Sequence, residues 1–209
     1  DNNPFSAGNL SEQKAVYANG KVYVFGKNEN GTHIEYSDVA NDNPSPWVPV
    51  TDNIPSNIDT YSATAWAGNI YFLARGTNDK QLYKLNVTTD KIEPVGTETF
   101  EMLIGGNDIK SELYVVKDGE SGIYKESPWT KDTDPFTQFK AGQPFFSNTT
   151  TASYNSNITT TVALCYNQGN TANDTTALVF NRISSDNKWE ERMQNLPLPN
   201  LENVTMIYY

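Results

Sequence analysis

Five residues have the types and spacing to bind a sugar. Trp47, Trp129 and Trp189 each lead a short predicted strand beside a polar loop, where an indole face can stack against a sugar ring. Lys21 and Glu35 lie on adjacent predicted strands and offer a hydrogen-bond donor and an acceptor for hydroxyl groups. We predict these five as the ligand-binding residues. The alternative is structural, with the tryptophans packed between neighbouring sheets and touching no ligand.

The residue types of this chain give little indication of a catalytic site or a metal site. A zinc site needs three or four ligands, whereas the chain has one histidine, His33, and one cysteine, Cys165. The cysteine lies in an apolar predicted strand, which is typical of a small core residue. We therefore expect no enzyme, no metal and no cofactor. A glycoside-acting hydrolase stays open as an alternative, because separated carboxylates can meet in a fold; the candidates are Glu35, Glu101, Glu112, Glu126 and Glu190.

The net charge and the hydropathy of the chain argue against nucleic acids as partners and against insertion into a membrane. The 209 residues include 15 Lys and Arg against 25 Asp and Glu, which gives a formal net charge of −10. Nucleic acids require a basic surface to release their counterions, so we expect no nucleic-acid partner. No apolar run approaches the roughly 20 residues of a membrane helix, so we expect no membrane insertion.

Strand-forming elements must position the five residues, because apolar residues alternate along much of the chain. The clearest unit is a predicted hairpin, in which Asn19-Gly20 joins the strands 14–18 and 21–26. Asn-Gly is the strongest short hairpin signal, since a type I′ turn needs positive φ at both central residues. Further strands are predicted over 32–37 and 47–50, with Pro49 suited to a sheet edge.

The same order of strands recurs four times. Second strands align Tyr23 with Tyr71 and Tyr114, and third strands align Tyr36 with Tyr83 and Tyr124. Four-stranded units that repeat every 40 to 50 residues, roughly, are typical of β-propeller blades. We therefore predict an all-β fold and one β-propeller domain over residues 1–209. Its four-stranded antiparallel blades span approximately 14–50, 61–95, 101–140 and 151–193, followed by a closing strand over 203–209.

Two aspects of this architecture stay open from the sequence. An antiparallel β-sandwich also has short, regularly spaced strands and is the alternative to a propeller. Closure of the ring with four blades, closure with five, and a ring shared by two copies of the chain are the alternatives, so a homo-oligomer is among them.

These blade motifs resemble those of the fungal fucose-specific lectins of the Aleuria aurantia type. The resemblance rests on Val22-Tyr-Val-Phe25, Asn30-Gly31, Ile34-Glu35-Tyr36 and the outer-strand Trp47, while Trp66 falls where a first-strand Trp is expected. It implies a propeller that holds fucose between blades, through an Arg before Val-Tyr, a third-strand Glu and a Trp from the next blade. Kelch propellers, with strands like residues 21–26, are similar as well.

Transferred to this chain, the lectin trio is incomplete in every unit. The first unit has Lys21 and Glu35, but Ile92 stands where the next blade's Trp is expected. The second has Asn69 and Lys84, followed by Trp129. The third has Glu112 and Lys125, followed by Trp189.

We expect a non-catalytic, carbohydrate-binding propeller that is secreted or displayed at the cell surface, with glycans or glycoproteins as partners. A kelch-like protein-interaction or scaffold module is the main alternative. A glycoprotein is also indicated, because Asn-x-Ser/Thr motifs begin at Asn9, Asn30, Asn86, Asn148, Asn157, Asn173 and Asn203.

Overall fold

Antiparallel strands make up the regular structure of this chain. The computed structural model describes residues 5–39, 45–75, 80–107, 111–117, 120–124, 130–131, 144–154, 157–167, 175–183 and 189–197. These residues form four four-stranded sheets, each built from four consecutive strands, and contain no helix. The all-β prediction is thus confirmed. The chain divides into two compact units, Asp1–Phe100 and Glu101–Tyr209.

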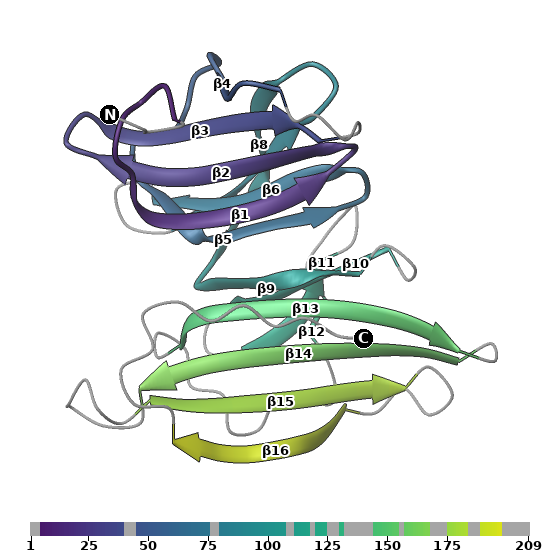
Figure 1. The fold of residues 1–209 in the computed structure, drawn as a ribbon. Coiled ribbons are helices and arrows are strands. Elements are labelled where there is room, and N and C mark those ends of the chain that lie inside the picture. The colour runs from purple at the N-terminus through teal and green to yellow at the C-terminus, as the bar shows by residue number, and fades with distance from the viewer. Residues whose placement is uncertain are drawn as a thin grey trace. The chain divides into compact units, whose positions relative to one another are not determined.

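The first unit holds two sheets whose strands pair in sequence order (Figure 1). The first sheet comprises β1 (Ser11–Ala18), β2 (Lys21–Asn28), β3 (Gly31–Asp38) and β4 (Val48–Pro49). The second comprises β5 (Ile58–Trp66), β6 (Asn69–Arg75), β7 (Lys80–Asn86) and β8 (Lys91–Phe100). Pro49 lies on an edge strand, as predicted, where its missing N–H breaks no ladder bond.

The first hairpin of each sheet, β1–β2 and β5–β6, turns through residues with positive φ. Asn19 and Gly20 have φ of 49° and 79°, which confirms the type I′ turn that their sequence predicts. Ala67 and Gly68 have φ of 49° and 71° at the equivalent turn of the second sheet. An L-residue other than Asn or Asp is unfavourable there, so Ala67 is held in a strained conformation by the surrounding strands.

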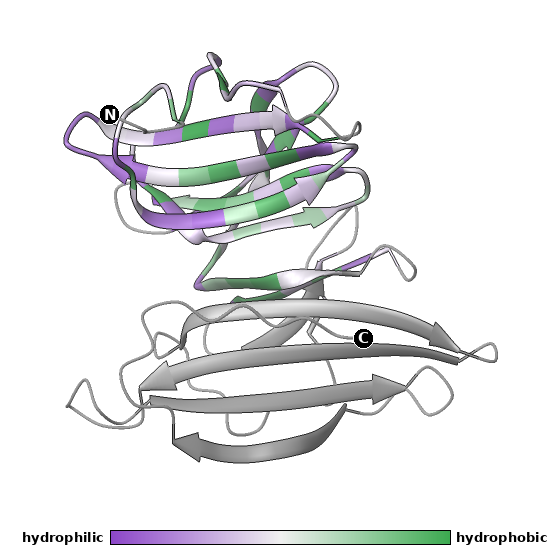
Figure 2. Ribbon diagram, in the orientation of Figure 1, coloured by the Kyte–Doolittle hydropathy of each residue, from purple (hydrophilic) through white to green (hydrophobic). Residues whose placement is uncertain are grey.

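The two sheets of the first unit share one apolar core. Tyr23 and Phe25 of β2 are fully buried, and the Phe25 ring lies 5.4 Å from that of Phe72 on β6. The Tyr23 hydroxyl donates a hydrogen bond to the backbone carbonyl of Val87, 3.4 Å away. Figure 2 shows the hydrophobic residues in the middle of these strands and the hydrophilic ones towards their ends. Trp66 is also buried, as predicted.

In both sheets, an irregularity interrupts the hydrogen-bond ladder between the first strand and the second. Pairing between β1 and β2 shifts between Ser11 and Lys14, and pairing between β5 and β6 shifts between Asp59 and Thr64. Within the second irregularity, the Ser62 hydroxyl accepts a hydrogen bond from the buried Leu73 N–H at 2.7 Å and donates one to the Asp59 carbonyl. The serine side chain therefore replaces a missing ladder partner.

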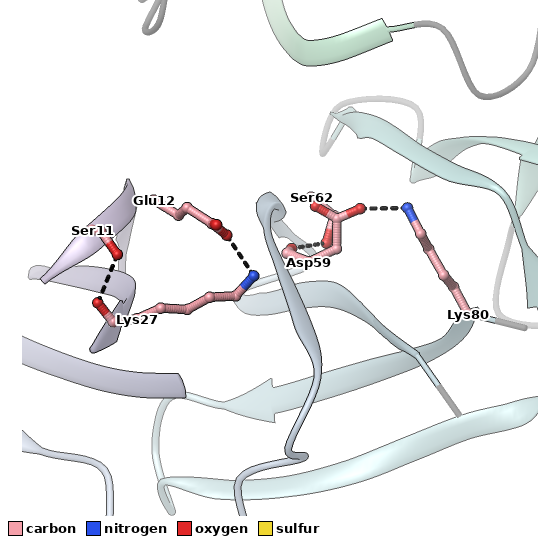
Figure 3. A network of polar contacts seen from close by, with 6 residues as sticks. All are labelled: Ser11, Glu12, Lys27, Asp59, Ser62 and Lys80. Carbon is pink, nitrogen blue, oxygen red and sulfur yellow. Dashed lines mark hydrogen bonds and ion pairs between the residues drawn. The ribbon is translucent and has the colours of Figure 1, made fainter. Parts of the chain in front are cut away.

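Ion pairs lie beside both irregularities. Figure 3 shows Glu12 paired with Lys27 next to the first, and Asp59 paired with Lys80 at 2.5 Å next to the second. Each ion pair joins the first strand of a sheet, β1 or β5, to another strand of the same sheet. Because the four side chains are partly exposed, these pairs contribute modestly to stability.

The second unit also contains two antiparallel sheets. One comprises β9 (Met102–Asn107), β10 (Glu112–Lys117), β11 (Glu120–Tyr124) and β12 (Thr130–Lys131). The other comprises β13 (Pro144–Tyr154), β14 (Asn157–Asn167), β15 (Thr175–Ile183) and β16 (Trp189–Pro197). The predicted closing strand over 203–209 lies outside the described residues, and the single-domain interpretation stays a prediction.

The predicted equivalence of the third-strand tyrosines is wrong. Tyr36 pairs with Tyr23, but Tyr83 pairs with Phe72, and Tyr124 pairs with Leu113, next to Tyr114. A shift of one residue places a side chain on the opposite face of a sheet. Sequence spacing missed this shift because the length of each turn sets the register independently of the aromatic pattern.

Candidate functional site

The predicted donor and acceptor, Lys21 and Glu35, lie on opposite faces of the first sheet. Lys21 pairs with Asp38, whereas Glu35 pairs with Val24, which is three positions along β2 from Lys21. Residues that pair directly share a face, and neighbours along a strand alternate between faces. The two side chains therefore stand in different surroundings and do not form one site.

On its own face, Lys21 joins what we term the rim cluster, made of Lys21, Tyr36 and Asp90. The Lys21 ammonium lies 4.0 Å from the centre of the Tyr36 ring and 3.9 Å from Asp90 Oδ1. Side-chain exposure is 24% for Lys21 and 33% for Asp90, so both remain accessible in part. The cluster thus places a cation, a phenol and a carboxylate together at the edge of the core between the two sheets.

The turn between β7 and β8 positions Asp90 within this cluster. The Asn86 side-chain oxygen accepts hydrogen bonds from the Thr88 and Thr89 N–H groups, at 3.0 and 3.2 Å, which is typical of an Asx turn. Asp90 follows with φ of 55°, a conformation that Asp tolerates better than most residues. This local chemistry directs a residue of the second sheet towards the first.

The hydroxyl groups of this region are held in their neutral form. Burial raises the pKa of Tyr23 well above its ordinary value, and the charge of Asp90, together with that of Tyr36 when it ionises, raises it further. Burial also raises the pKa of Tyr36, with added contributions from the charge of Asp90 and from a hydrogen bond to its carboxylate. Both phenols therefore remain hydrogen-bond donors well above neutral pH.

One carboxylate oxygen of the rim cluster lies in an ion pair but makes no hydrogen bond. Asp90 Oδ1 is buried and makes no hydrogen bond, since Lys21 Nζ at 3.9 Å is beyond hydrogen-bonding distance. Buried polar atoms are rarely left unsatisfied, so this acceptor requires a physical explanation. A hydroxyl placed between the two groups could donate to Oδ1 and accept from the ammonium.

Glu35 has a structural task on the other face of the sheet. Its carboxyl group is 1% exposed and accepts hydrogen bonds from the backbone N–H groups of Ser6 and Ala7, at 2.9 and 2.8 Å. These residues belong to a segment before β1, residues 5–10, which we term the strap. Glu35 thereby attaches the strap to the first sheet.

Of the predicted tryptophans, Trp47 also contacts the strap. Its ring lies 4.9 Å from that of Phe5, in a tilted arrangement, and the indole remains partly exposed. Trp189 is the first residue of β16, the edge strand of its sheet, and nothing further is described of its side chain. Trp129 lies outside the described residues.

Tyr36 and Asp90 are the functional candidates that sequence reasoning missed. The sequence indicates Tyr36 only as a repeat position, although its pairing with Tyr23 places it on the same face as Lys21. Asp90 carried a weak signal, since Asn86 and the two threonines after it indicate a turn that ends beside the next strand. Its contact with Lys21 follows only from the packing of the two sheets.

Searches for metal and membrane features found no candidates in the part of the chain that is described. Within it, no three His, Cys, Asp or Glu residues gather as a metal site would require. These described residues also include no helix that is long and apolar enough to cross a membrane. His33 instead contacts Asn28, with 2.8 Å between the imidazole Nε2 and the amide oxygen.

The match to a family model supports the propeller architecture. A family model described as the DUF6242 beta propeller domain matches residues 1–209. No curated protein matches the chain. Among solved structures, the chain is similar to the crystal structure of xylan beta-1,4-xylosidase from Bacillus halodurans C-125, with 13% identity and a TM-score of 0.43. That match covers 88% of this chain and 41% of the xylosidase chain, so this chain spans less than half of that protein.

Proposed function

The chain belongs to the DUF6242 beta propeller domain family, and we propose that this propeller binds carbohydrate without transforming it. The proposed site is the rim cluster of Lys21, Tyr36 and Asp90. Its groups are those that recognise sugar hydroxyls: a charged donor, a charged acceptor and a phenol, arranged beside an apolar core.

The observation that carries this proposal is the unsatisfied Asp90 Oδ1 beside the Lys21 ammonium. A sugar hydroxyl is both donor and acceptor, so one such group can satisfy the carboxylate and the ammonium together. Entry of the hydroxyl requires a rotation of the Lys21 side chain, which is partly exposed and whose ammonium lies 3.9 Å from Asp90 Oδ1 and 4.0 Å from the centre of the Tyr36 ring. Binding would thereby replace a long ion pair with two charge-assisted hydrogen bonds.

We extend the proposal to the partners and to the other sites. Glycans or glycoproteins outside the cell are the proposed ligands, and the propeller is proposed to be secreted or displayed at the cell surface. Trp129 and Trp189 are proposed as stacking faces of further sites, in keeping with the position of Trp189 at the start of an edge strand.

A glycan array followed by titration of the best ligand tests the proposal. Lys21→Met retains the aliphatic stem and removes the ammonium, and Asp90→Asn removes the carboxylate charge. Each should weaken binding about tenfold or more, because a hydrogen bond to a charged group is lost. The matched control is Lys27→Met, which removes a partly exposed strand lysine paired with Glu12 on the first sheet, and it should leave affinity unchanged.

Two results would contradict this function. Silence across the array at high protein concentration would overturn carbohydrate binding itself. Binding that survives both Lys21→Met and Asp90→Asn would exclude the rim cluster as the site. Trp129→Ala and Trp189→Ala would then show whether the sites lie on the other sheets.

A further inference from the structure

The strap occupies a surface of the first sheet that has the chemistry of a peptide-binding site. Glu35 presents two oxygens to two successive backbone N–H groups, those of Ser6 and Ala7. The Asn28 side-chain amide donates to the Ala7 carbonyl at 2.8 Å, and Trp47 packs against the Phe5 ring. These three polar contacts thus go to the strap's main chain, and the aromatic contact goes to one side chain.

The geometry of the strap itself defines what such a site accepts. Phe5 and Gly8 close a turn through a hydrogen bond from the Gly8 N–H to the Phe5 carbonyl, 3.3 Å long. Gly8 has φ of 81°, which favours glycine at this position. Ser6 is exposed, whereas Phe5 and Ala7 are partly buried. The strap thus presents an aromatic residue, an exposed residue that donates its backbone N–H, a small residue and glycine.

The sheet is shaped to receive the strap closely. A Cβ atom on Gly26 of β2 would lie 2.9 Å from Leu10 Cβ, nearer than real Cβ contacts occur. The absence of a side chain at Gly26 thus lets the end of the strap lie directly on the strand. Glu35, on the same face as Gly26, is buried together with this contact.

From these contacts we infer that Glu35, Asn28 and Trp47 form a peptide-recognition site that the strap fills as a tethered ligand. The site accepts other polypeptide segments with the same aromatic-x-small-glycine turn when the strap is released. A short tether gives an effective concentration of about millimolar, so the strap excludes weak competitors. This site is separate from the rim cluster, and its existence does not depend on carbohydrate binding.

A fluorescent, acetylated peptide of residues 5–10, Phe-Ser-Ala-Gly-Asn-Leu, tests this inference against the full chain carrying Phe5→Ala and Ser6→Pro. The first change removes the strap's aromatic ring, and the second removes the N–H that Glu35 Oε2 accepts. We expect anisotropy titration to show at least tenfold tighter binding to this variant than to the unaltered protein, where the tethered strap competes. The matched variant Phe5→Ala with Ser6→Ala keeps the N–H and should bind the peptide less tightly than the Pro variant.

Adding Glu35→Gln or Trp47→Ala to the strap variant should abolish peptide binding, while Lys21→Met should not affect it. No binding to the folded strap variant would overturn the inference, as would binding that is insensitive to Glu35→Gln and Trp47→Ala. If the strap variant does not fold, hydrogen exchange on the unaltered protein decides. Peptide at millimolar concentration should then accelerate exchange at the Ser6 and Ala7 amides, and an unchanged rate would overturn the inference.

Discussion

The first and second sheets of the Asp1–Phe100 unit are built to one plan but carry different chemistry at matching positions. Tyr23 and Tyr71 occupy the same place after their hairpin turns, yet Tyr23 pairs with Tyr36, whereas Tyr71 pairs with Lys84. Likewise, Lys21 corresponds to Asn69 at the strand start. Of these two sheets, the first alone thus carries the rim cluster, although the backbone pattern repeats.

This difference shows that ladder register, rather than strand spacing, determines which residues are equivalent. Tyr83 lies on the face of the second sheet that packs into the shared core, where its ring stacks on Phe72 with centres 5.8 Å apart. Tyr36 lies on the core face of the first sheet but near its edge, over Lys21. Repeated aromatics therefore serve the architecture in one blade and border a candidate site in the other.

The largest expected effect comes from the core that both sheets share. Phe25→Ala and Phe72→Ala each remove a fully buried ring, and each should lower the free energy of unfolding by about 3–5 kcal/mol. Because the rings are 5.4 Å apart, the double variant should lose less than the sum of the two. Urea unfolding measures these changes, with Tyr17→Ala, at a side chain that is 64% exposed, as the near-neutral control. Strict additivity would show that the sheets do not share one core.

A smaller change in the free energy of unfolding should distinguish the ladder irregularity of β5 from that of β1. Ser62→Ala leaves the buried Leu73 N–H without its partner and should lower stability by about 1–3 kcal/mol. Ser11→Ala is the matched change in the first sheet, where the hydroxyl donates to the Lys27 carbonyl in an exposed setting, and it should have an effect within about 0.5 kcal/mol. Equal losses in thermal unfolding would mean that the Ser62 hydroxyl does not replace a ladder bond.

Much of the first sheet could be predicted from the sequence, because its signals are local. Asn19-Gly20 specifies a turn by its φ preferences alone, and alternating residues from Lys21 onward specify a strand. The propeller followed from repeating this pattern, and the family match supports it. Such signals need no knowledge of what packs against the strand.

The candidate site could not be predicted to the same extent, because its partners come from distant parts of the chain. The sequence predicts Glu35 as a sugar ligand, but its oxygens accept hydrogen bonds from backbone N–H groups, which every residue except proline supplies. Asp90 reaches Lys21 only through the packing of two sheets and a positive-φ turn. A polar residue in a strand indicates that a partner exists, without indicating which one.

The β1–β2 and β5–β6 turns allow a comparison in which the free energy of unfolding should change by about 1 kcal/mol. Ala67 adopts a φ of 49° that L-alanine disfavours, so Ala67→Asn should raise the free energy of unfolding by about 1 kcal/mol. Asn19→Ala imposes the same strain on the first sheet and should lower it by a similar amount. Opposite shifts in the urea midpoint are the expected result. If Ala67→Asn were destabilising, a contact of the alanine methyl group would outweigh the turn preference.

The smallest effect concerns the connection between the sheets and depends on pH. Asp52, in the segment joining β4 to β5, accepts a hydrogen bond from the Ile92 N–H on β8 at 2.6 Å. That bond, with a second from the Asn53 N–H, lowers the pKa of Asp52 below its ordinary value. A carboxyl group whose pKa is lower in the folded state stabilises the protein above its unfolded-state pKa, and this contribution disappears as the pH falls through the folded-state value. Asp52→Asn should therefore reduce the loss of stability between about pH 6 and about pH 3, measured as the difference in urea midpoints. An unchanged difference would show that the charge of Asp52 contributes nothing to holding the connection against the second sheet.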